Sequence, residues 1–156
     1  MKALFVCTGN SCRSVMGEFL FEKAARDRGL AGWEAKSAGV AAEHYFSVPG
    51  GVHKALGARG ISPVVHQPQL VTRDLLRWAD EVYAMARNHR DLLWDQYPEF
   101  QKKTFLFLDK AGLGEKDVDD PIGQSDQVYE QCRDIIEDGI GRLLENHAKP
   151  TADPRP

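Results

Sequence analysis

The sequence of 156 residues contains no long apolar run and only a small excess of charge. No segment approaches the roughly 20 apolar residues that a membrane-spanning helix needs, and the N-terminus shows no signal-peptide pattern. The formal net charge of −3 gives no reason to expect broad electrostatic binding to nucleic acid. We therefore expect a cytoplasmic protein without a membrane or nucleic-acid partner.

Cysteine is also scarce, since the chain contains only Cys7, Cys12 and Cys132. Three cysteines do not form a disulfide framework, and no spacing of cysteine and histidine resembles a zinc site. The sequence therefore predicts no metal site and no cofactor. Hydrophobic residues make up 42% of the chain, which at this length is ordinary for one globular domain with its own core.

Short apolar runs alternate along the chain with segments of helical spacing. The runs predict strands at residues 2–6, 33–37, 81–85 and 104–108. The spacing predicts helices at residues 15–28, 51–59, 72–78, 88–96 and 125–145. Prolines at 61–70 and polar, glycine-containing residues at 109–124 predict irregular segments. The alternation indicates one α/β domain over residues 1–148, with a parallel sheet covered on both faces, and a flexible tail at 149–156.

The most informative segment is the loop Cys7–Ser14, CTGNSCRS, which connects the first predicted strand to the first predicted helix. Such a loop can direct several backbone N–H groups at one point, with the positive end of the helix behind it. It can therefore bind a phosphate or stabilise a thiolate. The guanidinium of Arg13 suits two oxygens of a tetrahedral oxyanion. Taken separately, Cys7 could be an ordinary buried cysteine and Gly9-Asn10 an ordinary turn. The combination of Cys7, the Gly-Asn pair and Arg13 in one loop after a strand favours a catalytic cysteine.

A second group of polar residues lies in the loop after the fourth predicted strand. In a parallel α/β sheet, ligands bind beyond the carboxyl ends of the strands, and both loops emerge at that edge. Asp120 is therefore a candidate partner for Cys7, although 113 positions separate them. Asp119 could serve as the acid instead, or Asp120-Pro121 could form an ordinary turn.

Three motifs together resemble the low-molecular-weight protein tyrosine phosphatases. They are FVCTGNSCRS at residues 5–14, SAG at 37–39 and DPIG at 120–123, and they occur in the family's order. The resemblance implies a doubly wound, four-stranded parallel sheet with a phosphate-binding loop after the first strand. It also implies hydrolysis of a phosphoprotein or a small phosphomonoester through a covalent cysteinyl-phosphate, without a metal.

The resemblance also implies roles for the residues that match the motifs. Cys7 matches the nucleophile, Arg13 the residue that holds the phosphoryl oxygens, and Asp120 the general acid. The residues implied to bind the substrate are those of the loop, namely Thr8, Gly9, Asn10, Ser11, Cys12, Arg13 and Ser14.

Supporting roles follow from the same resemblance. Asn10 and Ser14 match positions that brace the loop, and Ser14 is expected to hydrogen-bond the sulfur of Cys7. His66 matches a histidine that braces the loop asparagine. Cys12 matches a second thiol that can trap an oxidised nucleophile as a disulfide.

Four positions depart from patterns common in the family. Val15 stands where most bacterial members have proline, and Ile122-Gly123 stands where many tyrosine-specific members have two aromatics. Ser11 is closer to the threonine of the protein-arginine phosphatases than to the isoleucine common in tyrosine-specific members. We predict a phosphotyrosine phosphatase, with a protein-arginine phosphatase of the same family as the alternative.

Two further functions are alternatives of other kinds. A thioredoxin-coupled arsenate reductase shares the fold and the loop but needs further thiols near the third strand, where AMARNHRD at 84–91 has none. A non-catalytic phosphate-binding module would keep the loop but would not need both Cys7 and an acid before proline. We expect at least one of Tyr45 and Phe46, in the loop at 40–50, to line the mouth of the pocket.

Overall fold

Four parallel strands form the central sheet of the computed structural model, which describes residues 1–148. The strand order is β2-β1-β3-β4, and the strands are β1 (Lys2–Cys7), β2 (Glu34–Gly39), β3 (Glu81–Ala84) and β4 (Thr104–Leu106). The register sets Cys7 beside Gly39, at the carboxyl end of the two neighbouring strands. The predicted four-stranded parallel sheet is confirmed. The tail predicted at 149–156 lies outside the described residues.

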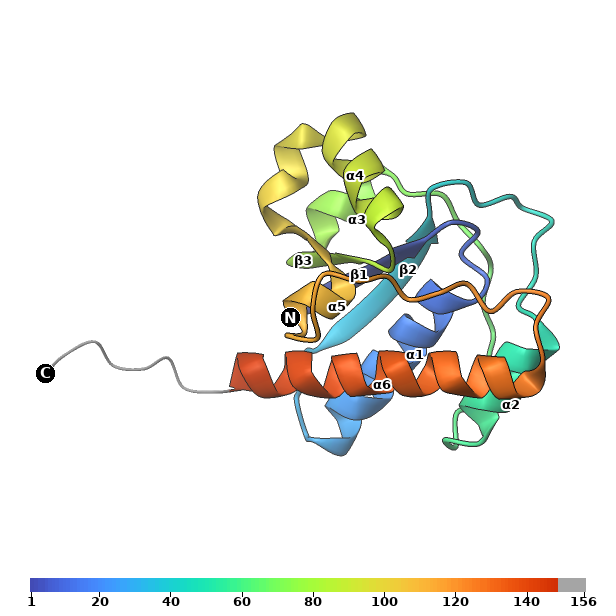
Figure 1. Ribbon diagram of the computed structural model, residues 1–156. Coiled ribbons are helices and arrows are strands. Elements are labelled where there is room, and N and C mark those ends of the chain that lie inside the picture. The colour runs from blue at the N-terminus through green and yellow to red at the C-terminus, as the bar shows by residue number, and fades with distance from the viewer. Residues whose placement is uncertain (149–156) are drawn as a thin grey trace, which may run out of the picture.

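Helices cover both faces of the sheet, as Figure 1 shows. The helices are α1 (Arg13–Asp27), α2 (Gly50–Gly57), α3 (Arg73–Trp78), α4 (Arg87–Gln96), α5 (Phe107–Lys110) and α6 (Asp126–Ala148). On one face α1 packs on β1 and β2, and α6 packs on α1 and α2, while α3 and α4 lie on the other face. The doubly wound arrangement is therefore confirmed. Within residues 1–148, no helix combines the length and apolar content needed to cross a membrane.

β1 is buried on both faces because its side chains alternate between two hydrophobic cores. Phe5 belongs to the larger core, where its ring contacts Phe21, Tyr83 and Phe107 at centroid distances of 5.3 to 5.8 Å. Leu4 and Val6 belong to the smaller core, under α3 and α4. A strand covered on both faces reads as a continuous apolar run, which is the pattern from which β1 was predicted.

The fourth strand is shorter than the sequence predicts. β4 ends at Leu106, and residues 107–110 form the short helix α5, which the apolar run at 104–108 did not reveal. The chain turns there because Phe107 enters the larger core, where its ring lies against Phe5 and against Gly139 of α6. Periodicity cannot separate a buried strand from a buried helical turn in so short a run.

Other helix and strand boundaries also differ from the predicted ones. β2 continues through Ala38 to Gly39, two residues beyond its predicted end, because these residues pair with Val6 and Cys7. α1 begins at Arg13 rather than at residue 15. Residues Pro98–Lys103 form a 3-10 helix that was not predicted.

Candidate active site

The loop Cys7–Ser14 turns directly from strand to helix, since Cys7 is the last residue of β1 and Arg13 is the first residue of α1. The turn requires Asn10 to adopt a φ of 55°, in the left-handed region that asparagine tolerates better than most residues. Asn10 is fully buried. Its position in the turn lets its side chain reach forward to Ser14, in the first turn of α1.

The end of β2 supports the loop from behind. The backbone N–H groups of Val40 and Ala41 donate to the carbonyls of Cys7 and Thr8, each at 2.9 Å. Gly39 allows this close approach, because a Cβ at Gly39 would lie 2.4 Å from the carbonyl oxygen of Thr8. The SAG motif at 37–39 therefore contributes a position where a side chain does not fit.

Ser14 and Asn10 organise the sulfur of Cys7. The Sγ of Cys7 lies 2.9 Å from the Oγ of Ser14, and the Nδ2 of Asn10 donates to the same oxygen at 2.9 Å. An amide nitrogen only donates, so the Ser14 oxygen accepts that bond and its own proton remains for the sulfur. A hydroxyl that donates to sulfur stabilises the thiolate.

His66 fixes the side-chain amide of Asn10 from outside the loop. Its Nε2 lies 3.0 Å from the Oδ1 of Asn10 and 3.2 Å from the Asn10 carbonyl oxygen. The backbone N–H of Gln69 donates to the same Oδ1 at 3.0 Å. Burial lowers the pKa of His66, so the neutral ring donates through Nε2. The contact between His66 and Asn10 that the resemblance implies is present.

The guanidinium of Arg13 is buried beside the loop, with the side chain only 8% exposed. Its Nη1 donates to the carbonyl of Val118 at 3.0 Å, and its Nη2 lies 3.5 Å from the Oγ1 of Thr8. Val118 is in turn held by Met85, whose carbonyl accepts the Val118 N–H at 2.8 Å. The same Nη2 lies 3.8 Å from the Oδ2 of Asp120. The loop after α5 therefore meets the loop after β1 at this guanidinium.

Two adjacent acids in that loop face different parts of the molecule. Asp120 lines the same cavity as Cys7, and its Oδ1 accepts the backbone N–H of Ile122 at 3.1 Å. Asp119 instead lines a separate hollow with Ile135. Of the two acids left open by the sequence, Asp120 is the one beside the sulfur.

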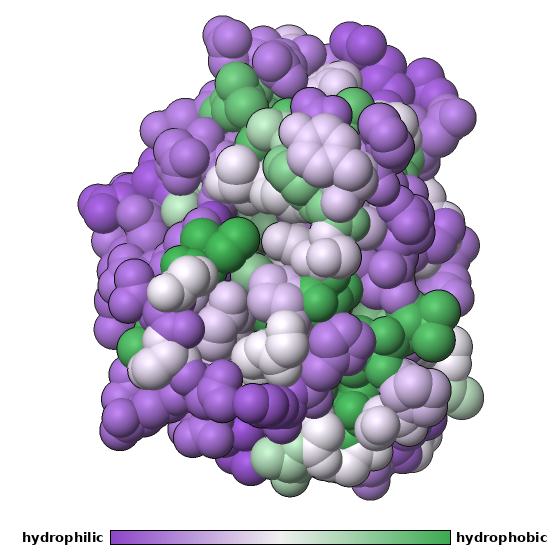
Figure 2. All heavy atoms as spheres, turned by 90° about the vertical axis from the view of Figure 1, so that its right-hand side faces the viewer, coloured by the Kyte–Doolittle hydropathy of each residue, from purple (hydrophilic) through white to green (hydrophobic). Residues whose placement is uncertain are grey.

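The cavity has a volume of about 250 Å³ and opens at the carboxyl ends of the strands. Figure 2 views this end of the molecule, where neutral and apolar side chains gather around the centre of the face within a hydrophilic surround. The lining residues are Cys7, Thr8, Gly9, Ser11, Cys12, Arg13, Phe46, Ser47, Asp120 and Ile122. Asn10 and Ser14, which were predicted to bind the substrate, lie behind this lining. Phe46 forms a wall, while Tyr45 packs edge-on against it and is 70% exposed.

The other two thiols are buried, Cys12 in the lining of the cavity and Cys132 in the larger core. Burial raises the pKa of Cys12 to about 11 and that of Cys132 to about 12. The Sγ of Cys132 lies 3.8 Å from the carbonyl oxygen of Asp119, which fits its predicted place in the core. Neither thiol is disulfide-bonded to Cys7 in this structure.

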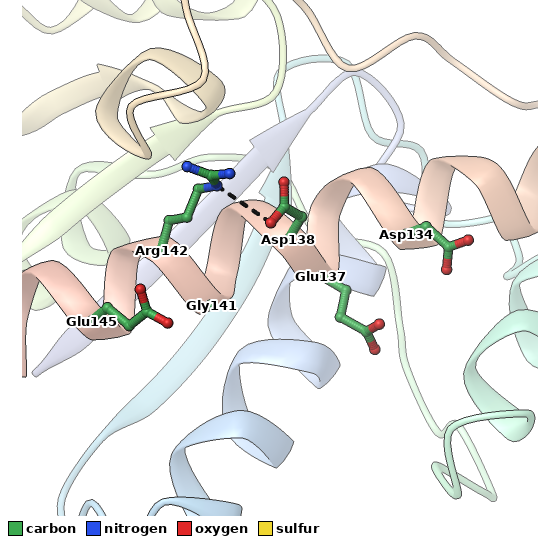
Figure 3. A pocket seen from close by; sticks show the side chains of 6 residues that line it. All are labelled: Asp134, Glu137, Asp138, Gly141, Arg142 and Glu145. Carbon is green, nitrogen blue, oxygen red and sulfur yellow. Dashed lines mark hydrogen bonds and ion pairs between the residues drawn. The ribbon is translucent and has the colours of Figure 1, made fainter.

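A larger hollow of about 520 Å³ lies along α6, away from these residues (Figure 3). Its lining residues all belong to that helix: Asp134, Glu137, Asp138, Gly141, Arg142 and Glu145. Asp138 and Arg142 pair with one another at 3.3 Å. The hollow has no nucleophile, so its size does not make it the candidate site. Among the described residues, no group of three His, Cys, Asp or Glu side chains is arranged to hold a metal ion.

Comparison with known proteins decides the family. The family model described as "Low molecular weight phosphotyrosine protein phosphatase" matches residues 2–152. The chain belongs to this family. The protein-arginine-phosphatase of Geobacillus stearothermophilus is 35% identical over 144 residues, which cover 92% of this chain and 94% of that protein.

Solved structures support the same assignment. A Cys-to-Ser variant of the arginine phosphatase YwlE, with a phosphorylated active-site serine, matches with a TM-score of 0.91 at 32% identity over 97% of this chain and 98% of that chain. The low-molecular-weight protein tyrosine phosphatase of T. tengcongensis matches with a TM-score of 0.88 at 38% identity over 94% and 99%. The family thus includes similar proteins named for either substrate.

Two residues around this phosphatase-family loop were missed in the sequence. Gln69 holds Asn10 only through its backbone N–H, for which no side-chain pattern exists. His89 contacts Thr8 from α4, with its Nε2 2.8 Å from the Thr8 Oγ1. The available signal was its place three residues into a helix that follows β3, at the edge where the loops meet.

Proposed function

We propose that this chain hydrolyses phosphorylated proteins through a phosphocysteine intermediate on Cys7, with phosphotyrosine as its main substrate. The observation that supports this most strongly is the cavity in which Cys7, Arg13 and Asp120 meet. Its apolar walls, Phe46 and Ile122, suit an aromatic ring above the phosphate-sized base. A nucleophile, an anion clamp and an acid in one space are the groups that phosphoryl transfer needs.

In the first step, the Cys7 thiolate attacks phosphorus and the bond from phosphorus to the leaving oxygen breaks. Arg13 and the loop N–H groups hold the equatorial oxygens, where negative charge is spread in the transition state. Asp120 gives its proton to the leaving oxygen of tyrosine. Ser14 stabilises the thiolate before the attack by donating to its sulfur.

In the second step, water attacks the phosphocysteine and the sulfur–phosphorus bond breaks. Asp120, now a carboxylate, accepts a proton from the water, and inorganic phosphate leaves with the Cys7 thiolate restored. The half-exposed carboxyl of Asp120 is accessible to water, as this step requires. No metal or redox partner takes part.

Hydrolysis of p-nitrophenyl phosphate and of a phosphotyrosine peptide tests the proposal. We expect Cys7→Ser to abolish turnover of both. Asp120→Asn should keep phosphate binding and slow peptide hydrolysis by roughly 10²- to 10⁴-fold, whereas the matched control Asp119→Asn should remain close to wild type. Near-normal turnover by Cys7→Ser would end the nucleophile assignment, and absence of wild-type turnover under reducing conditions would favour a phosphate-binding module.

Phosphoarginine is a second candidate substrate, and Ser11 is the observation that favours it. This small polar side chain lines the cavity beside Cys12, so it does not narrow the space with a branched apolar group. The carboxyl of Asp120 also stands where a guanidinium could approach it. The ratio of kcat/KM on phosphotyrosine and phosphoarginine peptides separates the two, and Ser11→Ile should move that ratio toward tyrosine.

We also propose that the protein acts in the cytoplasm. All three of its cysteines are free, and the proposed nucleophile must stay reduced to react. The cytosol maintains thiols in that form. Localisation of the tagged full chain by cell fractionation would test this assignment.

A further inference from the structure

His89 joins α4 to the loop after β1. It is the third residue of α4 and is fully buried. Its Nδ1 lies 3.1 Å from the backbone nitrogen of Ala86, the residue just before the helix. Its Nε2 lies 2.8 Å from the Oγ1 of Thr8, 81 positions away in the sequence. Both ring nitrogens therefore have a partner.

The two partners determine where the proton of His89 lies. A backbone N–H only donates, so the Nδ1 that receives the Ala86 N–H carries no proton. A neutral ring then carries its proton on Nε2 and donates it to Thr8. Burial, followed by the nearby charge of Arg13, lowers the pKa of His89 to about 4. The carboxylates of Asp117 and Asp120 act in the opposite direction but do not reverse this.

The Thr8 hydroxyl consequently accepts from His89 and can donate its own proton to another acceptor. Its oxygen accepts from His89 Nε2 and also faces the Nη2 of Arg13 at 3.5 Å, and both of these groups are donors. Within residues 1–148, the Oγ1 of Thr8 has no further hydrogen-bond partner. Thr8 lines the cavity that contains Cys7.

We propose that His89 is a positioning residue that turns the Thr8 hydroxyl into a donor for an oxygen of the bound phosphoryl group. The proposal rests on the proposed function, since it assumes that a phosphate occupies the cavity. His89 acts through Thr8 and does not itself touch the substrate. A donor held toward an anion by a buried neutral partner need not reorganise when the phosphate binds.

Four substitutions separate this role from a purely structural one. Thr8→Val removes the hydroxyl and keeps the shape, while Thr8→Ser keeps the hydroxyl. His89→Asn retains an acceptor near Nδ1 for the Ala86 N–H but cannot reach Thr8. His89→Gln reaches toward Thr8 with an amide N–H but loses the contact with Ala86. Calorimetric binding of inorganic phosphate to the full chain, together with steady-state kinetics, is the measurement.

We expect Thr8→Val and His89→Asn each to weaken phosphate binding roughly 10-fold or more, because a hydrogen bond to a charged group is lost. KM should rise by a similar factor while kcat changes little, since the bond exists in both ground and transition states. The double variant should be no weaker than either single variant. Thr8→Ser and His89→Gln should bind phosphate more tightly than Thr8→Val and His89→Asn, respectively.

Two results with the variants would overturn the proposal. The first is a double variant whose fold-loss of phosphate affinity equals the product of the two single fold-losses. The second is a His89→Asn variant that has a lower Tm but the phosphate affinity of wild type. If His89→Asn does not fold, ¹⁵N NMR of the wild-type ring decides: it should show a neutral ring with its proton on Nε2 from about pH 8 to about pH 5. A proton on Nδ1, or a charged ring in that range, refutes the proposal.

Failure of the proposed function would look different. In that case wild-type protein would not hydrolyse phosphotyrosine or phosphoarginine peptides, while phosphate binding and the ring NMR would still report on His89 and Thr8. If only the His89 proposal fails, wild-type turnover is intact, and the losses of phosphate affinity caused by substituting Thr8 and His89 are independent of one another.

Discussion

Gly39 offers the sharpest test of how β2 supports the loop Cys7–Ser14. In Gly39→Ala the new Cβ would lie 2.4 Å from the carbonyl oxygen of Thr8 and 2.9 Å from the backbone nitrogen of Asn10. Both neighbours are backbone atoms, so no side-chain rotation relieves the contact. Contacts under 3.0 Å essentially do not occur for a real Cβ, and 2.4 Å falls 0.6 Å short of that limit. The loop or the strand must therefore move by about that distance.

The size of this shift sets the expected effect. Displacing catalytic groups by about 1 Å can cost roughly 10²-fold in rate, so we expect kcat/KM of Gly39→Ala to fall by about 10- to 100-fold. Overpacking of this kind typically costs about 1–3 kcal/mol, which should also lower the free energy of unfolding. Hydrolysis of p-nitrophenyl phosphate and urea denaturation measure the two effects on the same protein sample.

A matched control is available in α2. Gly57 is the last residue of that helix, and a Cβ there would meet no atom within 4 Å. Gly57→Ala should leave kcat/KM unchanged and stabilise the protein by up to about 1 kcal/mol. If Gly39→Ala retained kcat/KM within about twofold of wild type, the argument that loop position is set by this close approach would be wrong.

Two further predictions follow from titratable groups whose pKa is raised by partial or complete burial. Burial raises the pKa of Glu18, which accepts a 2.8 Å hydrogen bond from Ser37, to about 7 from its ordinary value of 4.5. The folded state therefore holds this proton more tightly than the unfolded chain, so stability falls as pH rises through about 5 to 7. In Glu18→Gln, the free energy of unfolding measured by urea denaturation should fall by up to about 3 kcal/mol less over this pH range than in wild type. Peroxide should oxidise Cys7 and yield a Cys7–Cys12 disulfide in mass mapping. Closure should be faster at higher pH, because burial raises the pKa of Cys12 to about 11 and only its thiolate attacks.

Each of these two predictions has a clear contrary outcome. If wild type and Glu18→Gln lose stability equally between about pH 5 and pH 8, Glu18 does not hold an extra proton in the folded state. Glu43 is exposed, so Glu43→Gln is the control. Its loss of stability over this pH range should equal that of wild type. If Cys12→Ser forms the same oxidised products as wild type, Cys12 is not the resolving thiol.

Much of the fold could be predicted because local patterns reflect which faces of each element are buried. The apolar run of β1 indicated a strand covered on both sides, and its alternation between two cores explains that run. The fourth strand was predicted two residues too long, because Phe107 and Leu108 are equally apolar in a strand or a helical turn. The contact of Phe107 with Phe5 in the larger core decided in favour of the helical turn.

The sequence by itself determined the loop from Cys7 to Ser14, its position after a buried strand, and the edge of the sheet at which the proposed acid had to emerge. Those features depend on the order of residues and on the direction of parallel strands. Only the tertiary structure decided that Asp120 faces the cavity while Asp119 faces another hollow. It also decided that His89 reaches Thr8. Such contacts arise from how whole elements pack, which no local spacing encodes.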